Sequence, residues 1–426
     1  MGVRGLLADT APLSNPPFRR LWTANIVTVI GAQLTVVAVP AQIYAITGSS
    51  AYVGLTGVFG VVPLIVFGLW GGALADVFDR RSILYATTIG LILSSAAFWA
   101  QAAAGVDSVW LLLSLFSVQQ AFFAINQPTR SAVLPRLLPA HQLPAANALT
   151  MTVMQAGAIA GPLVGGVLIP VLGFSALYAV DTITLFATLW AVVRLPALPI
   201  EGAPAGAPGL RAVMDGFVYL RGHPVLLMSF VVDIIAMVFG MPRALFPEIA
   251  HQSFGGPVGG GLAFALLFAG IPIGAVLGGV LSGWVSRVRR QGRAVIGAVL
   301  VWGLAMAAFG GAVGLAPRAQ QVMLLVAVLM LVVGGAADMS SAAFRTSMLQ
   351  SAGSDAVRGR LQGVFIVVVA GGPRIADVLH GGAAALVGTA VTAAVGGLLV
   401  VVLVGWCAHA SPTFVRYRVE LPGRAP

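Results

Sequence analysis

Twelve long apolar runs dominate this sequence and limit the folds that it can adopt. Each run is more than 20 residues long and ends at Arg, Gly, Pro or a short polar stretch. A helix of about 20 apolar residues spans the hydrocarbon core of a bilayer. The chain is 59% hydrophobic and only 8% charged, whereas a soluble domain carries roughly 25% charged residues. The sequence therefore predicts one membrane-embedded unit.

We expect every run to form a helix. Strands of a transmembrane barrel would alternate in polarity over about ten residues, and these runs are continuous instead. The expected helices cover 20–46, 51–75, 82–104, 109–134, 144–172, 174–196, 225–250, 258–284, 294–315, 319–345, 360–386 and 388–409. The predicted fold class is an all-α membrane protein with twelve transmembrane helices.

A hydrophilic, proline-containing connection divides six expected helices from the other six. The sequence Gly-Gly-Ala-Leu at 71–74 recurs as Gly-Gly-Val-Leu at 278–281, which indicates two pseudo-symmetric halves. Secondary transporters are often built in this way, with substrate held between the halves. The predicted organisation is a cytoplasmic N-terminal segment, a six-helix half, a cytoplasmic linker, a second six-helix half and a cytoplasmic tail, at 1–19, 20–196, 197–224, 225–409 and 410–426.

The basic residues are all arginines, and their positions predict the orientation. The 23 Lys+Arg residues include no lysine, so a Walker A loop and a lysine Schiff base are excluded. Twenty arginines, Arg345 among them, fall on one side of the expected helices, and Arg318 alone falls on the other. The positive-inside rule then places both termini in the cytoplasm. Nucleic-acid binding is not expected, because the arginines are spread between apolar runs.

The sequence shows no pattern typical of an enzyme or a metal site. Cys407 is the only cysteine, so a multi-cysteine metal site is excluded. His-Glu-x-x-His and Gly-x-Ser-x-Gly are absent from the sequence. We therefore expect no cofactor, no metal and no catalytic residue. A membrane-embedded enzyme and a non-transporting scaffold remain as alternatives from other classes.

The segment 72–81, after the second expected helix, reads Gly-Ala-Leu-Ala-Asp-Val-Phe-Asp-Arg-Arg. It resembles the loop signature of the major facilitator superfamily, although Val77 and Asp79 replace the usual Arg and Gly. The resemblance implies a cytoplasmic gate, and the alternative is a basic turn that only fixes topology. The expected gate residues are Gly72, Asp76, Arg80, Arg81 and Arg130.

The fifth expected helix carries a second motif of small residues. Its members are Gly157, Gly161, Pro162, Gly165 and Gly166. Glycines four residues apart let two helices pack along their backbones. The motif resembles the exporter-associated signature of the same superfamily, which favours export over import. Generic small-residue packing is the alternative.

Further segments narrow the resemblance to one branch. Pro-Thr-Arg at 128–130, Arg-Ala-Leu-Phe-Pro at 243–247 and Gly-Arg-Leu-Gln-Gly at 359–363 are similar to the branch containing enterobactin exporters and macrolide efflux proteins. The resemblance implies a monomeric carrier of the bacterial inner membrane. It would export a siderophore or a hydrophobic antibiotic-like compound by alternating access. The expected partners are this substrate, protons and the lipid bilayer. An importer or facilitator is the alternative within the fold.

Ionisable residues inside the expected helices are candidates for proton coupling, because a charge at bilayer depth is costly and is usually functional or paired. Asp233 is the first candidate, with a permanent ion pair or an interfacial position as alternatives. The further candidates are Asp338, Arg374 and Asp377. Arg374 and Asp377 are three residues apart and are expected to neutralise each other. Asp181 is the weakest candidate, because the resemblance makes its helix peripheral.

The resemblance also implies a substrate cavity lined by the first, fourth, seventh and tenth helices. The polar candidates are Asn25, Gln33, Gln119, Gln120, Asp233 and Arg243. Neutral amides suit bulky compounds with hydrogen-bonding groups; the alternative is hydrogen bonding between helices. The fourth helix carries glutamines where many drug antiporters of the superfamily have an arginine. If protons drive transport, we therefore expect their route in the second half.

Overall fold

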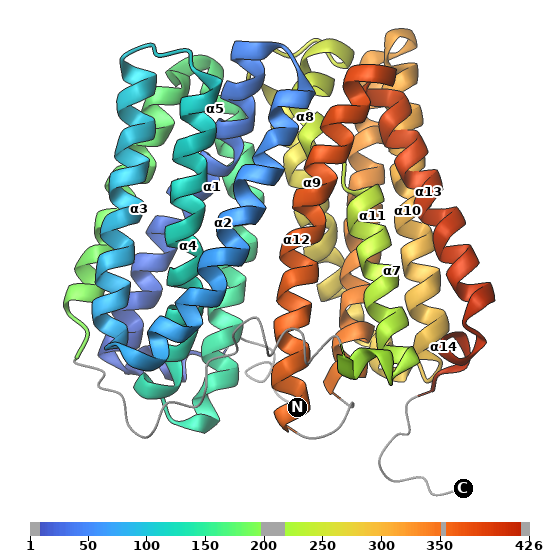
Figure 1. The fold of residues 1–426 in the computed structure, drawn as a ribbon. Coiled ribbons are helices and arrows are strands. Elements are labelled where there is room, and N and C mark those ends of the chain that lie inside the picture. The colour runs from blue at the N-terminus through green and yellow to red at the C-terminus, as the bar shows by residue number, and fades with distance from the viewer. Residues whose placement is uncertain (1–8, 197–217, 351–354, 419–426) are drawn as a thin grey trace, which may run out of the picture. The chain divides into compact units, whose positions relative to one another are not determined.

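The protein is helical throughout its described residues. The computed structural model describes residues 9–196, 218–350 and 355–418. The first five long helices are α1 (Pro16–Thr47), α2 (Ser50–Val77), α3 (Arg80–Ala103), α4 (Val109–Leu137) and α5 (Leu143–Val193). They are followed by α7 (Pro224–Gly240), α8 (Phe246–Glu248), α9 (Leu262–Val280), α10 (Gln291–Leu315), α11 (Gln320–Gln350), α12 (Asp355–Val387), α13 (Thr389–Ala410) and α14 (Pro412–Arg416) (Figure 1). Within those ranges no strand occurs, which confirms the predicted all-α class.

The lengths of these helices suit a bilayer. Ten helical segments in the described ranges are long and apolar enough to cross a membrane. One of them, Ala140–Val193, contains two helices, because Gly173 has a φ of 74° and interrupts the run. A left-handed φ of this kind favours glycine. α12 adds another helix of 33 residues. The structure is therefore consistent with the twelve predicted helices, and the predicted boundary at 172–174 is confirmed.

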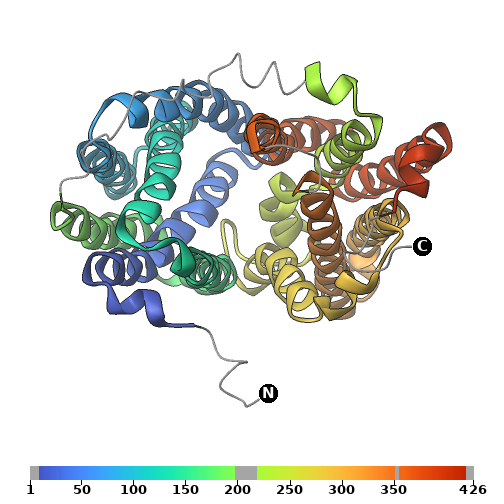
Figure 2. The same ribbon diagram turned by 90° about the horizontal axis from the view of Figure 1, so that it is seen from below.

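The chain forms two compact units. Unit 1 comprises residues 1–46 and 62–209, and unit 2 comprises residues 47–61 and 210–426. α2 is thus divided, with its first part in unit 2 and its remainder in unit 1. Figure 2 shows the helices of each unit from one end.

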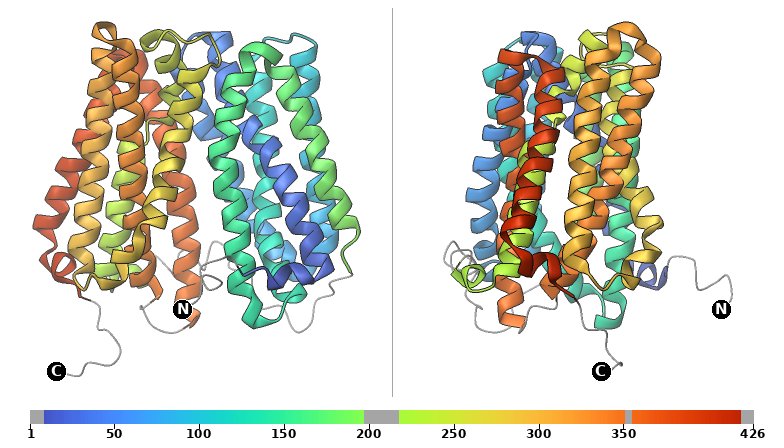
Figure 3. Two further views of the ribbon diagram at one scale, coloured as in Figure 1. Left: turned by 180° about the vertical axis from the view of Figure 1, so that it is seen from behind. Right: turned by 90° about the vertical axis from the view of Figure 1, so that its right-hand side faces the viewer.

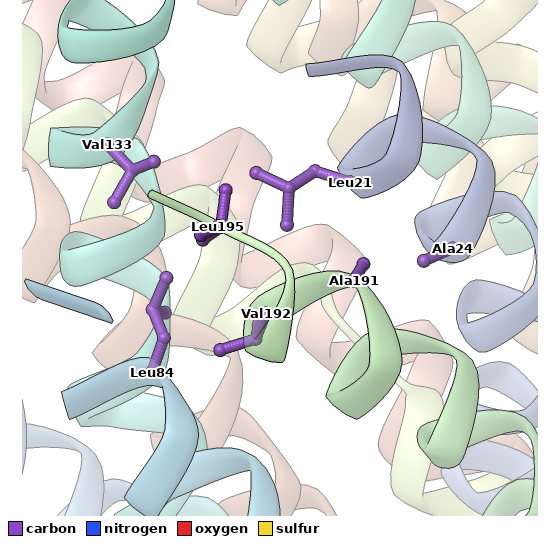
Figure 4. Packing of buried hydrophobic residues seen from close by; sticks show 7 residues of the cluster. All are labelled: Leu21, Ala24, Leu84, Val133, Ala191, Val192 and Leu195. Carbon is purple, nitrogen blue, oxygen red and sulfur yellow. The ribbon is translucent and has the colours of Figure 1, made fainter. Parts of the chain in front are cut away.

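Unit 1 has an apolar cluster where four helices meet. Leu21 and Ala24 of α1, Leu84 of α3 and Val133 of α4 pack with residues at the end of α5, and all are at most 5% exposed. The members from that last segment are Ala191, Val192 and Leu195 (Figure 4). Close packing here fixes one end of α1 against α5.

Unit 2 is held by close contacts between helix backbones. α10 runs beside α11 and α13 (Figure 3). A Cβ on Gly310 of α10 would lie 2.7 Å from Cα of Ala394 in α13. A Cβ on Gly335 of α11 would lie 2.9 Å from the carbonyl carbon of Ile271 and 3.1 Å from the backbone nitrogen of Ala275, both in α9. Glycine has no side chain, so the helix backbones approach closely at these positions. In lipid there is no hydrophobic driving force between helices, and van der Waals contacts of this kind hold them together.

The helix predicted at 225–250 is not continuous, and this correction concerns Arg243. α7 ends at Gly240, and a short turn, η4 (Arg243–Leu245), then leads into α8. Pro242 lacks the N–H that a continuing helix would need. Arg243 therefore lies in a turn beyond the break rather than inside a helix.

The first part of α2 is anchored within unit 2. The backbone N–H of Ser50, the first residue of α2, donates to Oε2 of Glu248 at 3.0 Å. An acidic side chain at a helix N-terminus is stabilised by the helix dipole. Glycines at 54 and 57 then pack directly on the backbone of α12 at Asp377 and Arg374.

Two neighbouring glycines of α10 give a test of the backbone contact. Gly310→Ala should lower the free energy of unfolding by about 1 to 3 kcal/mol, because the added methyl group meets the α13 backbone. Gly311→Ala is the matched control, since nothing lies within 4 Å of its Cβ position. It should leave stability unchanged or slightly higher. Thermal unfolding in detergent measures both, and equal melting temperatures would contradict the packing described.

Candidate functional site

Three charged side chains meet inside unit 2. Arg345 of α11 forms an ion pair with Asp233 of α7 through Nη1 and Oδ2. Its Nη2 lies 4.0 Å from Oδ1 of Asp338, two turns earlier on the same helix. The side chains of Arg345 and Asp233 are 7% and 2% exposed, whereas that of Asp338 is 31% exposed. One guanidinium group therefore lies beside two carboxylates. That of Asp233 is buried, and that of Asp338 is partly exposed.

The position of Arg345 differs from the expected one. We expected Arg345 at the end of the helix 319–345, on the arginine-rich side of the membrane. The helix instead continues to Gln350, and the Arg345 side chain is buried. The seven-residue spacing between Asp338 and Arg345 was the signal that could have revealed it, since residues two turns apart share a helix face.

A second ion pair joins the turn after α7 to α12. Nη2 of Arg243 lies 2.9 Å from Oδ2 of Asp377. Arg243 is 36% exposed at its side chain, and Asp377 is 3% exposed. We expected Arg374 and Asp377, three residues apart on α12, to neutralise each other, and this stays a prediction. The Arg374 guanidinium carbon lies 3.0 Å from the position that a Cβ on Gly60 would take.

His380 of α12 also contacts the end of α7. Its Nδ1 lies 2.8 Å from the carbonyl oxygen of Met241, and its Nε2 lies 3.0 Å from that of Phe239. Carbonyl groups at a helix C-terminus lack intrahelical partners. His380 supplies a polar contact there and is 5% exposed. The break in α7 is therefore held against α12 by His380 and by the Arg243–Asp377 pair.

The glycine motif of α5 packs against α1 in unit 1. Gly157 contacts Val29, Gly161 contacts Gln33, and Gly165 contacts Val37. Both series advance by four residues, so one row of α5 lies along one row of α1. Pro162 and Gly166 are buried in the same stretch. The close helix packing predicted for the motif is confirmed, and its role in export stays a prediction.

The expected gate residues lie at one end of unit 1. Arg80 donates to the carbonyl oxygen of Ala132 at 3.2 Å, and Arg81 donates to that of Val193 at 2.7 Å. Arg130 reaches the carbonyl oxygen of Leu21 at 3.5 Å. Arg80 and Arg81 therefore bind the C-terminal parts of α4 and α5, where a cation complements the helix dipole. Arg130 binds near the start of α1 instead.

Two further gate residues, Gly72 and Asp76, fall in the last turns of α2. Their helical backbone is described, but their side chains lie outside the described part of the structure. Asp79, which follows them, accepts from the backbone N–H of Ser82 at 3.3 Å and caps α3. Asp79 therefore has a local role at the start of that helix.

The amide candidates for a substrate cavity are not all alike. Asn25 of α1 is 5% exposed, and its Nδ2 has no hydrogen-bond partner. Gln33 is half-buried and packs on Gly161. Gln119 and Gln120 of α4 are also half-buried. An unpartnered buried amide favours a ligand contact at Asn25 more than at Gln33, which already has a packing role.

Ten long apolar helical segments in the described residues, with ionisable side chains buried among them, are typical of a multi-pass membrane protein. A family model described as transmembrane secretion effector, MFS_3, matches residues 7–414. The chain belongs to this family of the major facilitator superfamily. It is a multi-pass membrane protein of a secondary-transporter family.

Curated relatives match the same family, and solved structures share the fold. The enterobactin exporter EntS of Shigella boydii serotype 18 is 27% identical over 247 residues, which cover 56% of this chain and 57% of the relative. EntS of Escherichia coli O1:K1 / APEC gives the same identity and coverage. The matched region thus spans little more than half of these relatives. A bacterial homologue of the human lysosomal transporter Spinster has a TM-score of 0.71 at 16% identity and covers 96% of this chain and 99% of its own.

The Asp233–Arg345 pair can be tested through stability. Arg345→Gln should lower the free energy of unfolding by about 3 to 5 kcal/mol, because it leaves a buried carboxylate without its partner. The double variant with Asp233→Asn should recover most of the loss. Asp338→Asn is the matched control, and its partly exposed side chain predicts a smaller effect. Unfolding in detergent measures all four proteins. A double variant no more stable than Arg345→Gln alone would contradict the pairing.

Proposed function

We propose that this transporter exports a small amphipathic molecule in exchange for protons by alternating access. A siderophore or a hydrophobic antibiotic-like compound is the substrate class. The similarity to enterobactin exporters supports this class and the outward direction. The exporter-like glycine motif, packed along α1, supports the same direction.

The observation that carries proton exchange is the charge balance around Arg345. Asp233 and Asp338 share one guanidinium, so their ionised forms give this group of three side chains a net negative charge. Binding of a single proton neutralises the group without any other ion. Closely placed carboxylates of this kind titrate as a coupled pair rather than as separate residues.

The different exposures of the Asp233 and Asp338 side chains suggest different roles for them in the proposed exchange. Asp338 is the more accessible and is the group that exchanges a proton with water. Asp233 is sealed and holds Arg345. When Asp338 is protonated, Arg345 pairs with Asp233 alone, and α7 and α11 are held together. When Asp338 loses the proton, it competes for Arg345 and weakens that contact. The proton thus biases one helix arrangement over another.

The second ion pair and the amides complete the proposed transport route. Arg243 and Asp377, with Arg374 beside α2, are proposed to stabilise one conformation of unit 2. Asn25, Gln33, Gln119 and Gln120 are proposed to orient the substrate, with Asn25 the first to test. Gly72, Asp76, Arg80, Arg81 and Arg130 are the proposed cytoplasmic gate.

The proposed location is the bacterial inner membrane, with both termini in the cytoplasm and the protein acting as a monomer. The arginine asymmetry supports this orientation. The proposed domain division remains the one expected above, with halves at 20–196 and 225–409.

Proteoliposomes carrying a pH gradient test the exchange. Addition of enterobactin or a macrolide should dissipate the gradient with the wild-type protein. Asp233→Asn and Asp338→Asn should abolish substrate-dependent proton movement, because each removes one member of the coupled pair. Asp107→Asn, at an exposed loop residue, is the control and should behave like the wild type. A pH-sensitive dye inside the vesicles gives the readout. Undiminished proton movement in both variants would overturn this coupling site.

A further inference from the structure

Unit 1 contains a sealed carboxyl group whose partners are all uncharged. Asp181, in the second part of α5, is 1% exposed. Its Oδ2 accepts from the hydroxyl of Thr35 at 2.7 Å and from that of Ser95 at 2.9 Å. Its Oδ1 is buried and has no hydrogen-bond partner. α1, α3 and α5 thus enclose one carboxyl group between them.

Among the described residues no arginine forms an ion pair with Asp181. Arg194 follows it by thirteen residues on the same helix, a separation of about 20 Å. Arg130 is directed to the carbonyl oxygen of Leu21, which precedes Thr35 on α1 by a similar length of helix. Asp181 therefore differs from Asp233 and Asp377, which both have a guanidinium in contact.

The groups that face Asp181 come from three elements. α1 supplies Gly31 and Thr35, and α3 supplies Ser95. α5 itself supplies Tyr178, Thr182 and Thr184 around the same turn. Tyr178 is the one titratable group in this set, and its hydroxyl donates to Gln42 at 2.9 Å. In the part of the chain that the structure describes, no charged side chain pairs with Asp181 to balance its ionised form.

We propose that Asp181 is a proton-binding site of unit 1 and that it exchanges its proton during transport. An ionised carboxylate here would leave Oδ1 as an unpaired buried charge, which is far more costly than an unpaired neutral carbonyl. Hydroxyl groups both donate and accept. The contacts of Oδ2 with Thr35 and Ser95 therefore serve the ionised form as donors, and either hydroxyl can accept from the acid form. The site changes its protonation without requiring a new partner.

A proton fits this site better than a metal ion. The described residues contain no group of three or more His, Cys, Asp or Glu side chains able to hold a metal. The two hydroxyls are directed at one carboxyl oxygen. On the other side, a Cβ on Gly31 would lie 3.0 Å from Oδ1, so backbone rather than a set of oxygen ligands faces this atom.

Polar side chains extend from Asp181 toward one end of α3. The hydroxyl of Thr182 donates to Ser95 at 3.1 Å, and Thr182 also bonds the carbonyl oxygen of Tyr178. Gln42 accepts from Tyr178 and from Gln101, the latter at 3.1 Å. Gln101 lies two residues before the end of α3. In the proposed orientation this is the outer end, from which a proton gradient would load the site.

Protonation of Asp181 acts on α1. A Cβ on Gly31 would lie 2.7 Å from Cα of Asp181, so α1 and α5 are in backbone contact at this point. Thr35 is one turn further along α1 and donates to the same carboxyl group. The opposite row of α1, at Gln33, packs on the glycine motif of α5. A change at Asp181 therefore alters a helix held between the two parts of α5.

Infrared spectroscopy of the protein in lipid tests the proton directly, independently of transport. At pH 5.5 exposed carboxyl groups are ionised, because their ordinary pKa lies near 4. The wild-type protein should show the carbonyl stretch of a protonated carboxyl group that is missing in Asp181→Asn. Asp107→Asn, at an exposed position, should retain the stretch. Identical spectra for wild type and Asp181→Asn would overturn the proposal.

Thr35→Val is a second variant that keeps the carboxyl group. It removes a donor to the ionised form, so the infrared signal should persist to higher pH than in the wild type. Thr23→Val is the matched control on α1, because Thr23 is exposed and bonds only to its own helix. A signal that responds equally to both valine variants would contradict the contact with Asp181.

Stability and transport supply two further readouts. A proton held by the folded protein and released on unfolding makes stability fall as pH rises, and Asp181→Asn should flatten this dependence. Stabilisation by sodium at constant ionic strength that disappears in Asp181→Asn would overturn the proton assignment.

The exchange role rests on the proposed proton antiport, and unchanged coupled transport in Asp181→Asn would overturn that role alone. Loss of coupling in Asp233→Asn with no infrared change in Asp181→Asn would retain the antiport and reject this second site.

Discussion

The high cost of an unbalanced charge in a low-dielectric interior governs the polar architecture of this transporter. Unit 2 meets this constraint with guanidinium groups, which pair with Asp233 and Asp377. Unit 1 encloses Asp181 with hydroxyl groups instead. A paired carboxylate can remain ionised, whereas a carboxyl group with neutral partners favours the acid form. Buried acids therefore have guanidinium partners in unit 2 and hydroxyl partners in unit 1.

α7 connects the charged features of unit 2. Asp233 lies within the helix, and the break after Gly240 places Arg243 and the contacts of His380 at its end. The distance along the helix from Asp233 to the break is about 10 Å. A movement of α7 that follows proton exchange near Arg345 would therefore also act on the contacts with α12.

Glycine has a comparable structural role in both units. In unit 1 the row beginning at Gly157 lies along α1, and in unit 2 Gly310 and Gly335 bring neighbouring helix backbones into contact. The spacing of four residues allowed the first row to be predicted as a packing surface. Its partner on α1 was not predictable, because spacing identifies a face but not the helix that the face meets.

The sequence by itself determined the helices, their approximate ends and the membrane setting, because apolar length and turn residues are local properties of a chain. It also identified Asp233 as a buried acid. Only the tertiary structure decided that Arg345 is its partner, that Asp377 pairs with Arg243, and that Asp181 has hydroxyl partners. Each of these contacts joins different helices, and the rotation and packing of whole helices decide which side chains meet.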